Sequence, residues 1–111
     1  MVATTSELEH VIEDFARRLE PGIKVEAILL YGSYARGTPY DLSDIDLAVI
    51  SPDFENVPMY RRQKMIARLS VRRDGRISPL GYPSSEYHDP PPYSFLGEII
   101  RTGKIVYPTH T

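Results

Sequence analysis

The sequence predicts a single α/β domain in which helices flank a small mixed β-sheet. Three observations favour this class. The chain has 111 residues, of which 41% are hydrophobic and 25% are charged, which is typical of one globular domain with one core. Helical and strand patterns of apolar residues alternate along it. Glycines and prolines separate these segments, so we expect residues 1–111 to form one domain.

The first element is an amphipathic helix that ends at Pro21 and Gly22. Its apolar residues recur at helical spacing on one face, and they are Leu8, Val11, Ile12, Phe15 and Leu19. Ser6 and Glu9 have the spacing of a capping box, in which each side chain satisfies a free backbone N–H at the helix start.

Two strands are predicted next. Residues 24–31 are mostly apolar and precede a glycine, which indicates a buried strand. Residues 32–37 predict a tight turn into a short helix, and residues 38–43 a loop. Residues 44–50 alternate with a period of two, so that one face carries Ile45, Leu47 and Val49 and the other carries Asp44, Asp46 and Ala48.

The second half continues the alternation. Apolar spacing predicts a helix over about 58–71, and a turn follows at Asp74 and Gly75. Residues 76–82 predict a third strand, and Pro79 within it indicates a sheet edge or an early end of the strand. Five of the ten prolines lie in residues 79–92, and we expect residues 84–93 to be an extended surface loop.

The chain then returns to regular structure. Residues 95–100 have the apolar spacing of a short helix, which Gly103 ends. Residues 104–107 predict a closing strand. Tyr82, Tyr87 and Tyr93 lie on the proline-rich segment, where they could stack on a base, contact a partner or simply cover loop surface.

Charge is unevenly distributed. Residues 1–60 carry 4 Lys/Arg and 11 Asp/Glu, whereas residues 61–111 carry 9 Lys/Arg and 4 Asp/Glu. The basic stretch 61–76 could bind RNA, a triphosphate or an acidic partner, or could be a solvated helix face. We find no motif for sequence-specific nucleic-acid binding.

Composition excludes several other classes. The chain has no cysteine, so it has no disulfide, no thiolate metal site and no cysteine nucleophile. Its longest apolar run, residues 27–31, is far shorter than the roughly 20 residues of a membrane span. No secretory signal is visible at the N-terminus, and we expect a cytoplasmic protein that does not enter membranes.

Two carboxylates mark a candidate catalytic metal site. On a strand, Asp44 and Asp46 point to the same side with Cα atoms roughly 6.5–7 Å apart. Two such carboxylates repel unless a cation neutralises them. Oxygen ligands without cysteine favour a hard ion, Mg²⁺ or Mn²⁺.

Gly32 and Ser33 form a candidate nucleotide-binding turn after the preceding strand. Glycine lets a phosphate approach the backbone, where N–H groups and the serine hydroxyl can hold it. Arg36 is a further candidate phosphate contact, with an exposed helix residue as the alternative. Phosphate donors beside a divalent-metal pair are the minimal machinery for nucleotide chemistry.

These residues carry a family resemblance. Residues 30–37 and 42–50 contain Gly-Ser, ten further residues and then Asp-x-Asp. This pattern resembles the minimal nucleotidyltransferase family of the polymerase-beta superfamily, over nearly the whole chain. The resemblance implies a nucleotidyltransferase fold, two Mg²⁺ ions held by Asp44 and Asp46, and Ser33 in contact with the triphosphate. The implied reaction transfers a nucleoside monophosphate from an NTP, with ATP expected, to a hydroxyl and releases pyrophosphate.

One position departs from the family pattern. The family has a third carboxylate on the next core strand, where the best match in this chain is Ser78. That acid orients or deprotonates the acceptor hydroxyl, so its absence should affect chemistry more than NTP binding. Three explanations stay open: a nucleotide-binding module without catalysis, a substitute acid such as Asp74 or Glu86, or a different strand register.

The resemblance also implies a partner. Stand-alone minimal nucleotidyltransferases resemble the antitoxins of toxin–antitoxin pairs, whose toxin is a HEPN-type ribonuclease that the antitoxin binds, adenylylates on a tyrosine, or both. We expect no separate acceptor-binding domain in this chain, so the acceptor would supply its own surface or the chain would form a homo- or hetero-oligomer. A small-molecule nucleotidyltransferase is the further alternative.

Overall fold

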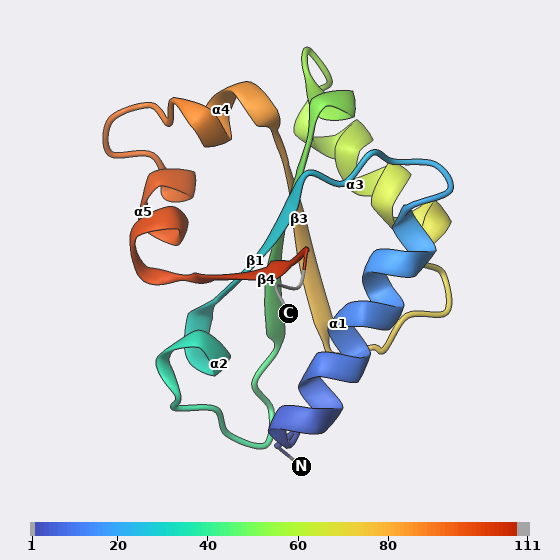
Figure 1. Ribbon diagram of the computed structural model, residues 1–111, viewed down its shortest axis with the longest axis vertical. Coiled ribbons are helices and arrows are strands. Elements are labelled where there is room, and N and C mark those ends of the chain that lie inside the picture. The colour runs from blue at the N-terminus through green and yellow to red at the C-terminus, as the bar shows by residue number, and fades with distance from the viewer. Residues whose placement is uncertain (1, 109–111) are drawn as a thin grey trace.

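A computed structural model of the chain describes residues 2–108 and shows a mixed four-stranded sheet with helices on both faces (Figure 1). The strand order is β3-β2-β1-β4, where β1 is Ala27–Tyr31, β2 is Ile45–Ser51, β3 is Ile77–Pro83 and β4 is Lys104–Tyr107. β2 pairs antiparallel with β1 and parallel with β3, and β4 pairs antiparallel with β1. The predicted α/β class with a mixed sheet is confirmed.

The helices divide between the two faces of the sheet. Figure 1 shows α1 (Thr5–Leu19) and α3 (Met59–Leu69) on one side, and α4 (Ser84–His88) and α5 (Phe95–Thr102) on the other. The short helix α2 (Gly32–Arg36) follows β1 directly. In the part of the chain that the structure describes, no helix combines the length and the apolar character needed to cross a membrane.

Strands β1, β2 and β3 contribute to two apolar clusters because successive side chains point to opposite faces. The cluster against α1 and α3 includes Phe15, Leu19, Ile28, Leu30, Ile45, Leu47, Val49, Phe54 and Ile66. The cluster against α4 and α5 consists of Ala27, Leu29, Ala48, Ile50, Tyr82, Leu96 and Ile99. β2 is therefore buried on both faces, except near its start, where Asp46 takes a position on the α4/α5 face.

The first helix begins earlier than the sequence predicted. The expected capping box of Ser6 and Glu9 is wrong, because Thr4 is the N-cap and Glu7 its partner. The Glu7 N–H donates to Thr4 Oγ1 at 3.1 Å, and the Thr4 N–H donates to Glu7 Oε1 at 3.4 Å. The buried Ala3 donates its N–H to the Tyr34 hydroxyl at 3.1 Å, which fixes the chain just before this cap.

The expected surface loop over residues 84–93 is also wrong in its first half, which forms α4. The prolines of this region lie at its borders, so no proline interrupts the helical hydrogen bonds of Ser84–His88. Tertiary contacts hold the helix in place: Ser85 donates its N–H and its hydroxyl to Glu55, at 2.9 and 2.6 Å, and the His88 ring bonds Glu26.

β3 lies at a sheet edge, as Pro79 predicted. On the outer side of β3, the side chain of Gln63 on α3 makes hydrogen bonds that a further strand would otherwise make. Gln63 Nε2 donates to the Pro79 carbonyl at 2.7 Å, and the Gly81 N–H donates to Gln63 Oε1 at 3.1 Å. Arg62 Nη1 also donates to the Gly81 carbonyl at 3.1 Å. These bonds satisfy outward-facing backbone groups of the edge strand and fix β3, which carries Ser78, against α3.

Candidate active site

Three neighbouring strands form a polar row at one end of the sheet. Tyr31 of β1 pairs in register with Asp46 of β2, and Asp46 pairs in register with Ser78 of β3. Paired residues point to the same face, which here is the α4/α5 face. Asp44 lies two residues before Asp46, just outside β2, and is exposed. Asp46 is thus placed on this face at the end of the sheet where β2 begins, and the negative charge of Asp44 acts on it from the residue just before the strand.

Gly32 brings the backbone of the predicted nucleotide-binding turn against Asp46. A Cβ atom at this position would lie only 2.1 Å from Asp46 Oδ2, and the φ angle of Gly32 is +74°. Only glycine combines this conformation with such a close approach. The sequence predicted that both segments belong to one site, and the structure places Gly32 and Asp46 in direct contact.

Ser33 and Arg36 lie on α2, directly after this contact. Ser33 is half-buried and Arg36 is exposed. No side chain caps the first turn of α2, and Gly37 ends the helix in the left-handed conformation with a φ of +73°. The hydroxyl of Ser33 and the guanidinium of Arg36 are therefore both available beside the carboxylates.

The electrostatics of Asp46 show why a cation would be favourable here. Burial raises the pKa of Asp46 above its ordinary value, and the negative charge of Asp44 raises that pKa further. The positive charge of Arg36 acts in the opposite direction and lowers it. Burial, together with the charge of Asp46, also raises the pKa of the Tyr31 hydroxyl. The ionised form of Asp46 is thus disfavoured in the protein alone.

The donor set fits a hard divalent cation. The two carboxylates lie two residues apart and close enough for the charge of one to act on the other, and oxygen is the ligand atom that Mg²⁺ prefers. Gly32 leaves room beside Asp46 that any other side chain would fill. A cation bound to Asp44 and Asp46 would remove the repulsion that raises the pKa of Asp46.

No third carboxylate completes the site. Among residues 2–108, no cluster of three or more histidine, aspartate or glutamate side chains could hold a metal. Asp74 precedes β3, and its two oxygens accept from Arg76 Nε at 3.0 Å and Arg76 Nη2 at 2.9 Å. Glu86 lies on α4 near Tyr82, which is four residues along β3 from Ser78. In the predicted register, Ser78 therefore stands where the family pattern has an acid.

Most of the basic stretch 61–76 lies away from the carboxylates, but the carbonyl of its last residue, Arg76, accepts the Ile45 N–H at 2.8 Å, next to Asp44. Its helix α3 packs through Ile66 on the opposite face of the sheet. Arg62, Arg73 and Arg76 bond neighbouring groups of the fold. The remaining basic side chains are exposed, and they are Arg61, Lys64, Arg68 and Arg72. Helix α3 does not line the site, so its basic residues would attract a triphosphate only at long range.

The structure adds two aromatic residues that the sequence did not single out. Tyr31 lies in the polar row, and Phe95 of α5 packs edge-on against it, with the ring centroids 5.7 Å apart. The period of β1 could have placed Tyr31 on the face of Asp46, since Tyr31 directly precedes Gly32. No local signal pairs Tyr31 with Phe95, because that contact depends on how α5 docks onto the sheet.

The fold and this polar row define a nucleotidyltransferase-type domain, with a Gly-Ser turn beside an Asp-x-Asp strand. The family model described as "Polymerase beta, Nucleotidyltransferase" matches residues 11–111. The chain belongs to this family.

Similar proteins carry related names. The "Putative protein adenylyltransferase MJ1215" of Methanocaldococcus jannaschii is 37% identical over 57 residues, which cover 51% of this chain and 63% of that protein. MJ1305, of the same organism and the same description, is 38% identical over 69 residues, 60% of this chain and 42% of that protein. The matched part thus spans less than two thirds of these relatives. MJ0141, again so named, is 30% identical over 81 residues, 68% of this chain and 80% of that protein.

Solved structures share the fold. A crystal structure of a "putative nucleotidyltransferase" from Sulfolobus solfataricus superposes with a TM-score of 0.68 at 16% identity, and covers 88% of this chain and 78% of that one. A second structure, described as a toxin–antitoxin with AMP-PNP, has a TM-score of 0.55 at 22% identity and covers 92% of this chain and 74% of that one. At such identities the likeness establishes the fold alone.

Proposed function

We propose that this chain is the antitoxin of a HEPN/minimal nucleotidyltransferase pair, and that it transfers AMP from ATP to a tyrosine hydroxyl of its partner. The observation that carries the proposal is the contact between the Gly32 turn and Asp46, on which the charge of Asp44 acts. The names of the adenylyltransferase relatives and the toxin–antitoxin neighbour with AMP-PNP support it. ATP and Mg²⁺ are supplied in the cytoplasm, where we expect the protein to act.

Each site residue has a role in this proposal. Asp44 and Asp46 would hold Mg²⁺, two ions in the active form. When bound, Mg²⁺ supplies charge neutralisation for the phosphates and for the leaving pyrophosphate. Ser33 and the backbone of Gly32 would hold the triphosphate, and Arg36 would contact its outer phosphates. These contacts would bring the α-phosphate of ATP to the carboxylates.

The proposed reaction is a single transfer of AMP from ATP to a tyrosine oxygen. The oxygen of the partner tyrosine attacks the α-phosphorus of ATP and forms a phosphodiester with AMP. The bond from that phosphorus to the bridging oxygen breaks, and pyrophosphate leaves with its electron pair. The phenolic proton passes to solvent, because the position in register with Asp46 that would hold a base is the neutral Ser78.

Ser78 favours a second candidate, a module that binds nucleotide and partner without transfer. In that case the chain would neutralise a toxin by binding alone, and Ser78→Asp would confer transfer. A small-molecule nucleotidyltransferase is a third candidate, and tight binding of an antibiotic would favour it.

Label transfer from ATP distinguishes these candidates. The full chain is incubated with ATP labelled at the α-phosphate, Mg²⁺ and the product of the neighbouring gene. We expect label on that partner, lost with EDTA and in Asp44→Asn and Asp46→Asn. The matched control is Asp14→Asn, which removes an exposed carboxylate on the opposite face, paired only with Arg18. Absence of label, with partner binding unchanged in Asp46→Asn, would contradict transfer and support the binding module.

A further inference from the structure

Phe95 contacts the polar row through the side chain of Tyr31. Its ring meets the ring of Tyr31 at an interplanar angle of 85° and a centroid distance of 5.7 Å. Tyr31 is in register with Asp46 and directly precedes Gly32. Phe95 therefore borders the candidate site on the β1 side, opposite to Ser78 on the β3 side.

Neighbouring contacts fix the position of Phe95, but much of its side chain remains exposed to solvent. The neighbouring Leu96 and Ile99 are buried in the cluster of the α4/α5 face and anchor α5 to β1 and β2. Ser94 caps the helix by accepting the Gly97 N–H at 3.0 Å. Phe95 itself is nevertheless 56% exposed, which is unusual for an aromatic residue next to an apolar cluster.

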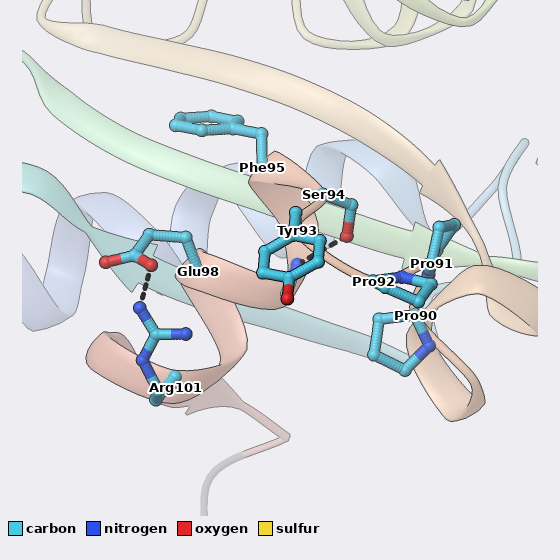
Figure 2. Close-up of a pocket in the computed structure, with 9 residues that line it drawn as sticks. Pro90, Pro91, Pro92, Tyr93, Ser94, Phe95, Glu98 and Arg101 are labelled. Carbon is cyan, nitrogen blue, oxygen red and sulfur yellow. Dashed lines mark hydrogen bonds and ion pairs between the residues drawn. The ribbon is translucent and has the colours of Figure 1, made fainter.

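A pocket of about 890 Å³ opens beside Phe95. Its lining is mostly apolar and includes Tyr93 and the three prolines at 90–92. Figure 2 shows Phe95 projecting from the start of α5, away from those prolines. The one charged pair of the lining, Glu98 and Arg101, is joined by an ion pair and so neutralises itself. The pocket suits a flat uncharged ring better than a second anion.

We infer that Phe95 is the nucleobase platform of this site, on which the purine of a nucleoside triphosphate stacks. The inference deepens the proposed function and rests on it, because the phosphates must lie at Gly32 and Asp46 for the base to reach Phe95. The ribose then lies over Tyr31, and the base extends across the open face of Phe95 at the border of the pocket. Aromatic side chains bind bases in this way without hydrogen-bond readout.

Comparing two ligands separates the base from the phosphates. Binding of ATP and of inorganic tripolyphosphate, each with Mg²⁺, is measured for the full chain by calorimetry. Phe95→Ala should weaken ATP binding about tenfold, within the roughly 5- to 150-fold expected for loss of one stacking partner. Tripolyphosphate binding should stay unchanged. Tyr60→Ala, which removes a ring that is 62% exposed on α3 at the opposite face of the sheet, should change neither ligand.

A tryptophan reporter tests the contact itself. The chain has no tryptophan, so Phe95→Trp introduces a single fluorophore that also retains the stacking surface. ATP should quench it, and tripolyphosphate should not. The matched reporter Tyr60→Trp, at a position that is 62% exposed on α3 on the opposite face, should respond to neither ligand.

The outcomes distinguish the two proposals. If the unmodified chain binds neither ligand in the presence of Mg²⁺, the proposed function is overturned and the inference with it. If it binds both and Phe95→Ala weakens both equally or neither, the phosphate site stands and Phe95 is not the platform. If Phe95→Ala instead abolishes only binding of the partner protein, the ring is a protein contact and the inference is wrong.

Discussion

Gly32 and Gly37 offer a matched test of the candidate site. Both flank α2, and their φ angles are +74° and +73°. They differ in what a side chain would meet. A Cβ atom on Gly32 would lie 2.1 Å from Asp46 Oδ2, whereas a Cβ atom on Gly37 would have nothing within 4 Å. Gly37→Ala therefore isolates backbone strain, and Gly32→Ala adds the displacement of the Asp46 carboxylate.

The expected magnitudes follow from these two differences. An alanine in the left-handed region costs about 1–2 kcal/mol, which is the whole effect expected for Gly37→Ala. In Gly32→Ala the carboxylate of Asp46 must also leave its rotamer, at a further cost of about 0.5–1.5 kcal/mol. In Tm, each kcal/mol corresponds to roughly 4 °C for a domain of this size.

Urea unfolding in EDTA measures the two stabilities, and calorimetry measures Mg²⁺-ATP binding. We expect Gly32→Ala to abolish detectable nucleotide binding and Gly37→Ala to preserve it. In an Asp46→Ala background, Gly32→Ala should cost no more than Gly37→Ala, because the colliding carboxylate is gone. Equal destabilisation by both variants in the unmodified background, with binding retained in both, would refute the contact between Gly32 and Asp46.

Three further predictions concern charge and the edge strand. Burial and Asp44 raise the folded-state pKa of Asp46, so in EDTA the contribution of Asp46 to stability should be lost as the pH rises above the ordinary carboxyl pKa of 3.8, whereas Glu55 and Asp74, whose pKa values are lowered, act in the opposite direction. Asp46→Asn should abolish this loss in urea unfolding compared at about pH 4 and about pH 7, and an identical pH dependence in both proteins would contradict it. Ser78→Asp should lower the metal-free stability by about 1 kcal/mol through repulsion of Asp46 and should make Mg²⁺ stabilising in thermal melts. No response to Mg²⁺ would argue against a shared site. Gln63→Leu should cost about 1–3 kcal/mol by leaving backbone groups of β3 unpaired, whereas the adjacent exposed Lys64→Leu should cost under about 0.5 kcal/mol. Equal effects in chemical denaturation would remove the role of Gln63.

Sequence periodicity predicted the parts of the fold whose signal is local. The alternation of Ile45, Leu47 and Val49 with Asp46 fixed which face of β2 carries the carboxylates, and the register now pairs Asp46 with Ser78 as expected. Pro79 correctly indicated an edge strand, because a proline cannot donate a backbone hydrogen bond. These features depend on strand geometry alone.

The remaining features depend on tertiary contacts that have no local pattern. Residues 84–88 are helical because Glu55 and Glu26 from distant segments bond Ser85 and His88. The helix start at Thr4 is fixed by a contact between Ala3 and Tyr34, 31 residues away. Phe95 joins the candidate site only because α5 docks beside β1. Proline content favoured a loop at residues 84–93, and these long-range contacts outweighed it in the first half.

Most of the excess aspartate and glutamate residues in the first half of the chain have partners in the fold. Glu13 and Asp14 pair with arginines on their own helix, and most of the other acids bond neighbouring parts of the fold. Within residues 2–108, Asp44 and Asp46 have no ion pair within 4 Å, although burial makes the charge of Asp46 costly. A fold that pairs most of its other acids but leaves these two carboxylates without an ion pair favours a ligand of positive charge beside them. That asymmetry, rather than the net charge, is the physical reason to expect a divalent cation here.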